Sequence, residues 1–205
     1  MIKLFLASSF SEVACLFQNF VKDELQNKSV TFIPTASKVE EYKGHVENDQ
    51  QAFLDLGITI DVLELTTASR EEIETKLAVN DFIFVSGGNT FYLLQEMRRS
   101  GADELIKAQL LQGKIYIGTS AGSVILSPNI QYLEAMDDKS KAPLLSNYNG
   151  LKLIEEYPLV HYQNFPFTET VELIYQTYKN QIPLVILSNN QVLIIENQTT
   201  RVISV

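Results

Sequence analysis

The 205-residue sequence has a single cysteine, Cys15, and no tryptophan. One cysteine excludes a disulfide within the chain and is typical of proteins in a reducing compartment. With only two histidines beside it, the sequence also cannot assemble the usual structural zinc sites. We therefore expect no metal site and no bound cofactor.

Long apolar runs and an excess of positive charge are missing as well. No stretch approaches the roughly 20 apolar residues of a membrane span, and polar residues follow the short apolar start at once, unlike in a signal peptide. The net charge of −9 favours neither nucleic acid nor anionic lipid as a partner. We expect a cytoplasmic protein that binds neither nucleic acid nor membrane; whether it is a monomer or a homodimer stays open.

What the sequence does contain is a regular alternation of strand and helix patterns. Apolar, β-branched segments at 2–7, 30–34, 58–65, 81–86 and 115–117 are separated by amphipathic segments. This alternation predicts an α/β fold, with a doubly wound, mostly parallel sheet that carries helices on both faces. The length suits one domain over residues 1–205.

The pattern loosens in the last third of the chain. A helix is predicted at 168–180, and short strands are predicted at 151–154, 159–162, 184–187, 192–196 and 200–205. Asn189 and Asn190 are expected to form a hairpin-like turn between two of these strands. In a parallel sheet, ligands collect at the carboxyl ends of the strands, so we look for the functional residues there.

The segment 115–127, which reads IYIGTSAGSVILS, contains a G-x-S-x-G motif centred on Ser120. A strand, a sharp turn and a helix around a central serine are typical of a nucleophile elbow at a strand carboxyl end. Gly118 and Gly122 fit because side chains there would collide with the neighbouring strand and helix. The Ala121 amide would then face a forming oxyanion. The alternative is a glycine-rich turn that merely connects two elements.

A nucleophilic serine needs a base, and His161 is the only histidine after Ser120. A neutral imidazole at a strand end accepts the hydroxyl proton and later donates it to the leaving amine. The acidic loop 134–138, directly after the elbow helix, is the best source of a carboxylate that orients the imidazole. The other histidine, His45, is expected on the solvated surface.

A second oxyanion donor is predicted at the turn Gly87-Gly88-Asn89-Thr90, which directly follows the strand at 81–86. Glycine at position 88 lets the backbone N–H approach the substrate closely. Asn89 either caps the following helix or holds a substrate carboxylate or amine with its side-chain amide.

Three segments, at 85–94, 117–122 and 150–162, resemble the peptidase E family. Members of that family are cytoplasmic serine dipeptidases of the α-aspartyl type, related to cyanophycinases and to the glutamine-amidotransferase-like fold. The resemblance implies Ser120 as nucleophile, His161 as base, and Gly88 with Ala121 as oxyanion donors.

The sequence departs from the family pattern in the loop after the elbow helix. Ala135 precedes Met136 where the family has its triad aspartate, and Gln131 stands where aspartate-specific members carry arginine. We predict that Glu134, one residue earlier and one methylene longer, orients the imidazole, with Asp137 as the alternative. Strict specificity for aspartyl peptides is not expected.

The sequence therefore favours a serine-type peptidase that hydrolyses small peptides through an acyl-enzyme on Ser120. Two other functions stay open. One is a catalytically silent relative that binds a small ligand in the same cleft. The other is a carboxyl-ester hydrolase, because the order serine, acid, histidine also fits α/β-hydrolases.

Overall fold

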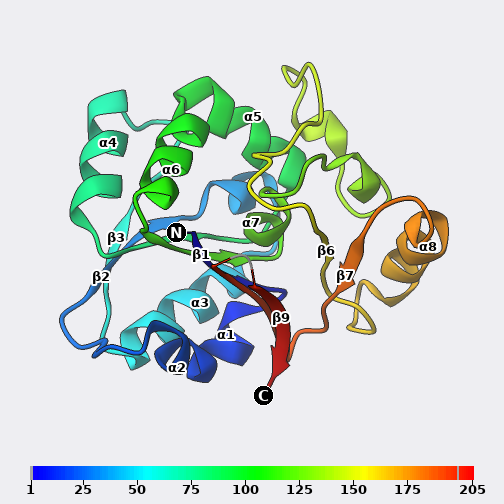
Figure 1. Ribbon diagram of the computed structural model, residues 1–205. Helices are drawn as coiled ribbons and strands as arrows, with labels where there is room; N and C mark the ends of the chain where they lie inside the picture. The colour runs from blue at the N-terminus through cyan, green and yellow to red at the C-terminus, as the bar shows by residue number, and fades with distance from the viewer. Residues whose placement is uncertain (1, 198) are drawn as a thin grey trace.

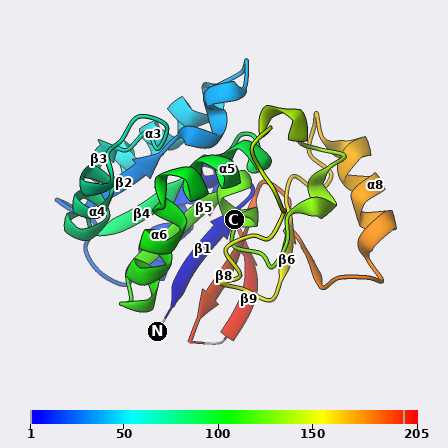
Figure 2. The ribbon, with the colours of Figure 1, turned by 90° about the horizontal axis from the view of Figure 1, so that it is seen from above.

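A seven-stranded sheet forms the centre of the protein in the computed structural model, which describes residues 2–197 and 199–205. Its strands are β1 (Lys3–Ala7), β2 (Ser29–Ile33), β3 (Thr59–Val62), β4 (Phe82–Val85), β5 (Ile115–Thr119), β8 (Gln191–Glu196) and β9 (Thr199–Ser204). They lie in the order β3-β2-β4-β5-β1-β8-β9, as Figure 2 shows. The first five are parallel, whereas β8 runs antiparallel to β1 and β9 antiparallel to β8.

Helices cover both faces of this sheet (Figure 1). One face carries α1 (Phe10–Val13), α2 (Phe17–Val21) and α3 (Gly44–Asp55), and the other carries α4 (Arg70–Val79), α5 (Thr90–Ser100), α6 (Ala102–Leu111) and α7 (Ala121–Val124). Single 3₁₀ turns lie at η1 (Ala14–Leu16), η2 (Thr35–Val39), η3 (Gln131–Leu133) and η4 (Lys139–Lys141). The predicted α/β class, with a mostly parallel sheet between helix layers, is confirmed.

A smaller unit lies beside the sheet, at the right of Figure 1. It consists of α8 (Thr168–Tyr178) and two short parallel strands, β6 (Tyr157–Leu159) and β7 (Leu184–Ile186). Val171 and Ile174 bury the inner face of α8 against the larger core. This unit brings the chain back across the sheet before it adds β8 and β9.

The two sheet faces bury different kinds of side chain, because successive residues of a strand point to opposite faces. Leu4, Leu6 and Tyr116 pack under α4–α7. Phe5 and Ile117 pack under α1–α3, in a cluster that contains eight of the eleven phenylalanines. The burial of these strands on both faces matches their continuous apolar character.

The register of the sheet decides which loops meet at its carboxyl edge. Ala7 of β1 pairs with Thr119 of β5 on one side and with Val192 of β8 on the other. Because β8 is antiparallel, the residues just before it lie at the same edge as the residues just after β5. Ser120 and the turn before β8 are thereby placed together.

Two predicted strands after the elbow differ in the structure. Residues 151–154 form no strand, because the backbone N–H groups of Leu151 and Leu153 donate to the carbonyls of Ile125 and Leu126 just after α7. The strand predicted at 159–162 is β6, which ends at Leu159. His161 therefore follows the strand, with a backbone φ of 60°.

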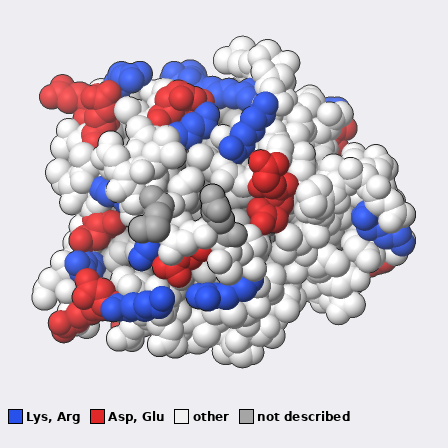
Figure 3. Space-filling view, viewed as in Figure 1, with Lys and Arg blue, Asp and Glu red and all other residues white. Residues whose placement is uncertain are grey.

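No helix among the described residues is long and apolar enough to cross a membrane. Acidic and basic side chains are interspersed on the face shown in Figure 3.

Candidate active site

Ser120 lies at the sharp turn between β5 and α7, with φ 49° and ψ −114°. This conformation is strained for a residue with a side chain, and such strain concentrates at functional sites. The Ser120 N–H donates to Ala7 O at 2.9 Å, and the buried Ser123 Oγ donates to the same carbonyl at 2.8 Å. These bonds fix the turn against β1, so the Ser120 side chain stays at the carboxyl edge of the sheet.

Both glycines of the motif are required by close backbone contacts. A Cβ on Gly122 would lie 2.0 Å from Val85 O in β4, and one on Gly118 would lie 2.6 Å from Gly122 C and O. Backbone cannot move away as a flexible side chain can, so no other residue fits without distortion. The steric reason predicted for the two glycines is present in the structure.

His161 meets Ser120 directly. Its Nε2 lies 2.9 Å from Ser120 Oγ, within hydrogen-bond distance. The ring stacks on Phe167 at a centroid distance of 4.8 Å and an interplanar angle of 24°, and the His161 N–H donates to Ser8 Oγ at 3.2 Å. The structure thus brings together the two residues that the sequence assigns as nucleophile and base.

The group that holds the imidazole is Asn189, not Glu134. His161 Nδ1 lies 2.8 Å from Asn189 Oδ1, while Glu134 forms an ion pair with Lys139 at 3.3 Å. Asn189 Nδ2 donates to Glu12 Oε1 at 3.1 Å. A carboxylate only accepts, so Glu12 needs the amide NH₂ and leaves Oδ1 for the imidazole. Nδ1 then carries the proton, and Nε2 is free to accept one from Ser120.

The alternative carboxylate, Asp137, is also directed elsewhere. Its Oδ2 accepts a hydrogen bond from the Thr90 backbone N–H at 2.8 Å, at the start of α5. The loop 134–138 therefore packs against α5 rather than against the imidazole. In the sequence, Asn189 is marked only by its place in a turn beside a closing strand. That turn lies at the same end of the sheet as Ser120 because β8 pairs antiparallel with β1.

The two predicted oxyanion donors lie at this edge. The backbone N–H groups of Gly88 and Ala121 have no acceptor among the described residues. Gly88 has φ 132°, and a Cβ there would lie 2.3 Å from Ala36 C and O, so only glycine fits. Free N–H groups at a helix start and at an adjacent turn are suited to a developing negative charge.

Of the two roles predicted for Asn89, the structure shows the helix cap. Its Oδ1 accepts from Tyr92 N at 2.9 Å, which caps α5, and its Nδ2 donates to Asp138 O at 3.1 Å. The side chain is 2% exposed, and both of its ends are engaged. Asn89 therefore fastens the loop after η3 to the turn at Gly88.

Ser120 and His161 line a cavity of about 780 Å³, which we call the cleft. Its apolar lining comes from Tyr42, Met136, Phe165, Pro166 and Phe167, and its charged lining comes from Glu12, Glu40, Asp49, Asp137, Asp138 and Lys141. His45, expected on the solvated surface, is half-buried in this lining, with Nε2 3.3 Å from Gly87 O. A volume of this size is typical of small-molecule sites.

Burial shifts the pKa values of His161, Asp137 and Asp49 in the cleft. It lowers the pKa of His161 below its ordinary value, although the hydrogen bond with Asn189 acts in the opposite direction. It raises the pKa of Asp137 to about 6 and that of Asp49 to about 8. At neutral pH the imidazole is therefore neutral, Asp137 is mostly ionised and Asp49 is mostly protonated.

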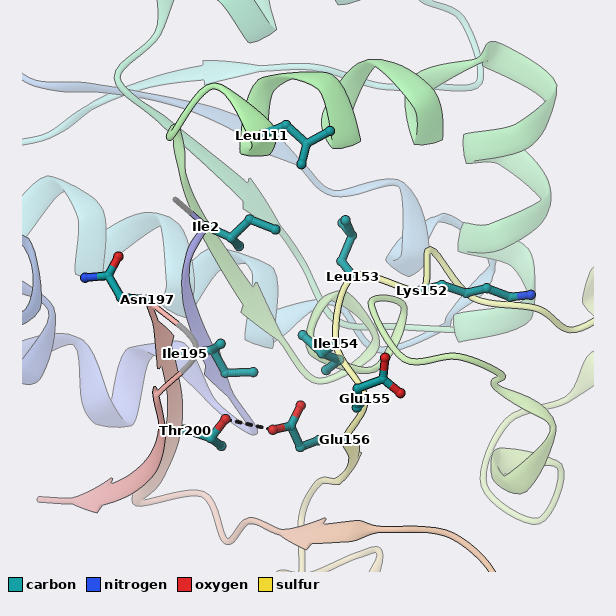
Figure 4. Close-up of a pocket in the computed structure, with 10 residues that line it drawn as sticks. All are labelled: Ile2, Leu111, Lys152, Leu153, Ile154, Glu155, Glu156, Ile195, Asn197 and Thr200. Carbon is teal, nitrogen blue, oxygen red and sulfur yellow. Dashed lines mark hydrogen bonds between the residues drawn. The ribbon is translucent and has the colours of Figure 1, made fainter.

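A second hollow, of about 750 Å³, lies at the opposite edge of the sheet (Figure 4). It is lined by Ile2 before β1, Asn197 after β8 and Thr200 in β9, whose hydroxyl donates to Glu156 Oε1 at 2.7 Å. No histidine is among its lining residues in the described part of the chain. The nucleophile and base pair thus belongs to the cleft alone among these two hollows.

The comparison with known proteins decides the family. The sequence profile of peptidase family S51 matches residues 4–203. The chain belongs to peptidase family S51. An uncharacterized peptidase of Pasteurella multocida is 50% identical over 199 residues, covering 97% of this chain and 96% of that protein. An uncharacterized peptidase of Listeria monocytogenes is 48% identical over 198 residues, which cover 97% of this chain and 96% of that protein.

Further matches include proteins named peptidase E. Peptidase E of a Nostoc species is 28% identical over 170 residues, which cover 79% of this chain and 66% of that protein. A crystal structure from Listeria monocytogenes EGD-e, provisionally named a peptidase E protein, superposes with a TM-score of 0.96. It is 46% identical and covers 100% of this chain and 99% of its own. The resemblance to peptidase E is confirmed.

Proposed function

We propose that this S51 family member is a serine-type peptidase that hydrolyses small peptides, with Ser120 as nucleophile and His161 as general base. The observation that carries the proposal is the 2.9 Å contact between Ser120 Oγ and His161 Nε2 at a strained strand-to-helix turn. Nucleophile and base within hydrogen-bond distance, with the base held by a third group, are the geometric signature of covalent catalysis.

The reaction follows from the positions of these groups. His161 Nε2 takes the Ser120 proton as Oγ attacks the peptide carbonyl, and the N–H groups of Gly88 and Ala121 stabilise the oxyanion. The imidazolium then gives its proton to the leaving amine, so the C–N bond breaks and an acyl-enzyme remains. A water molecule, deprotonated by His161, hydrolyses the ester and restores the serine.

Asn189 is the positioning residue of this scheme. Its Oδ1 accepts the His161 Nδ1–H, which fixes the tautomer with Nε2 toward Ser120. Asparagine fills this place in papain-like enzymes, so a carboxylate is not indispensable. A neutral amide stabilises the imidazolium less than a carboxylate does, and this feature favours the competing function, a silent relative that binds a ligand in the same cleft.

Peptide hydrolysis separates the candidates. Purified protein is assayed against a dipeptide panel and against short-chain carboxyl esters, with Ser120→Ala and the exposed Ser140→Ala as a matched pair. We expect dipeptides to be cleaved better than esters, and we expect Ser120→Ala to lose the activity with an unchanged Tm, because the hydroxyl faces the cleft. An active Ser120→Ala protein would overturn the mechanism, and an inactive wild type that still binds dipeptides would favour the silent relative.

A further inference from the structure

The cleft has a marked excess of acidic side chains. Five carboxyl groups line it, against one lysine, Lys141. Asp49 is 2% exposed and its raised pKa leaves it mostly neutral at pH 7, so Glu12, Glu40, Asp137 and Asp138 supply the charge. A like charge on the substrate is disfavoured in such a site, whereas a positive charge is attracted.

One of these carboxylates is held beside the predicted oxyanion donor. Thr90 N–H donates to Asp137 Oδ2 at 2.8 Å, and Asn89 Nδ2 donates to Asp138 O at 3.1 Å. Thr90 and Asn89 directly follow Gly88 in the chain. Two hydrogen bonds from the turn itself therefore fix where Asp137 lies relative to the substrate carbonyl.

A second carboxylate, Glu40, is close to the first. Glu40 lines the cleft together with Asp137 and His45, and its charge raises the pKa of both. The Glu40 side chain forms no hydrogen bond and no ion pair with the described residues. Two carboxylates in one cleft that form no ion pair with a protein cation are stabilised by a ligand that carries a positive charge.

The α-amino group of a peptide is carried by the carbon next to the first carbonyl. When that carbonyl lies between Gly88 and Ala121, the amino group lies within one residue's reach of the turn. We propose that Asp137 and Glu40 bind the free α-ammonium of the substrate, and that the cleft selects peptides whose first residue is neutral or basic and rejects an acidic one. This inference rests on the proposed function, because it takes Ser120 as the point of attack.

Two aromatic side chains at the mouth of the cleft fit an uncharged or long side chain on that first residue. Tyr42 is 72% exposed and Phe165 is 93% exposed, and both line the cavity. Aromatic rings offer apolar contact area at low entropic cost and attract cations. The aliphatic stem of a lysine or the side chain of an alanine or leucine is suited to such a rim.

Binding to the Ser120→Ala protein tests the inference without requiring catalysis. Calorimetry at pH 7 compares Lys-Leu, Ala-Leu, Asp-Leu and N-acetyl-Ala-Leu. We expect Lys-Leu and Ala-Leu to bind at least about tenfold more tightly than Asp-Leu, whose side-chain carboxylate is repelled by the acidic cleft. We expect the same difference from the acetylated peptide, which lacks the α-ammonium charge. Asp-Leu binding as tightly as Ala-Leu, or acetylation without effect, would overturn the inference. If the peptides bind in the predicted order of affinity but the wild-type protein cleaves none of them, only the proposed function is contradicted.

Matched variants on the same background identify the residues. Asp137→Asn keeps an oxygen that accepts the Thr90 N–H, and Glu40→Gln breaks no side-chain hydrogen bond. The control is Glu134→Gln, which removes a carboxylate of the same loop that pairs with Lys139. We expect the first two to weaken Ala-Leu binding about tenfold and to leave acetylated peptide unchanged, with Glu134→Gln equal to the parent. Wild-type affinity in both Asp137→Asn and Glu40→Gln would contradict the assignment.

Discussion

At the scale of single residues, Asn189 orients His161 in place of the carboxylate that was predicted from the loop 134–138. The Asn189 side-chain amide lies between His161 Nδ1 and Glu12 Oε1, and the Asn189 backbone N–H donates to Asn164 Oδ1 at 2.9 Å. These three contacts hold the residue in place. The charge of Glu12 raises the pKa of His161 from the far side of this amide.

We predict that Asn189→Ala lowers kcat by up to about 10⁴-fold, the loss found when the orienting aspartate of a serine triad is removed. Asn189→Asp should retain activity and move the acid limb of the pH profile upward, since a carboxylate raises the histidine pKa. The matched control is Glu134→Gln, which should equal wild type. Full activity of Asn189→Ala together with a damaged Glu134→Gln would return the role to Glu134.

The pH dependence follows from two residues with opposite shifts. Neutral His161 is the active form, and burial lowers its pKa, so kcat should persist below pH 6.5 and fall only at lower pH. Asp137, with a pKa of about 6, loses its charge as the pH falls through that value, and kcat/KM should fall there first. Asp137→Asn should remove this upper step. A kcat that rises on acidification would be incompatible with His161 as base.

At the scale of elements, the turn from β5 to α7 depends on the backbone approach at Gly118 and Gly122. A side chain at 122 would press on Val85 O in β4 and force the strand and the helix apart. The position of Ser120 is thus fixed by packing between two elements, as well as by its own hydrogen bonds.

We predict that Gly122→Ala lowers the free energy of unfolding by about 1–3 kcal/mol, as expected for overpacking against backbone. Gly44→Ala is the control, because its Cβ would meet only the Tyr42 ring end, which is free to move, at the first position of α3. Urea unfolding measures both. Equal stability of the two variants would mean that the turn relaxes without cost.

The elements themselves were predictable where periodicity is strong. The structure has β1, β2, β4 and β5 close to their predicted bounds, since buried parallel strands form continuous apolar runs. The amphipathic segment after the first predicted strand forms α1, η1 and α2 in place of one continuous helix, because an apolar stripe does not reveal a local change of helical winding. Residues 151–154 have strand-like composition, yet the N–H groups of Leu151 and Leu153 donate to backbone carbonyls just after α7 and not to a neighbouring strand.

At the scale of the whole molecule, the order of the strands brings together residues that no local sequence pattern connects. Ser120 and His161 were identified from a local motif and from the scarcity of histidine. Asn189 was missed because its position depends on β8 lying antiparallel beside β1, a pairing between residues nearly 190 positions apart. Substrate contact was one of two roles predicted for Asn89, and Asp137 was the alternative to Glu134 for the imidazole, but each of the two side chains holds the loop after η3 against α5.

The most direct test of the central claim is the intact mass of the protein after reaction with a fluorophosphonate, followed by peptide mapping. Only an activated serine reacts rapidly with this probe. We expect one adduct on Ser120, none in Ser120→Ala and a strongly slowed reaction in His161→Ala. A wild-type protein that gains no adduct, or gains it on another serine, or reacts equally fast without His161, would show that Ser120 and His161 do not form a nucleophile and base pair.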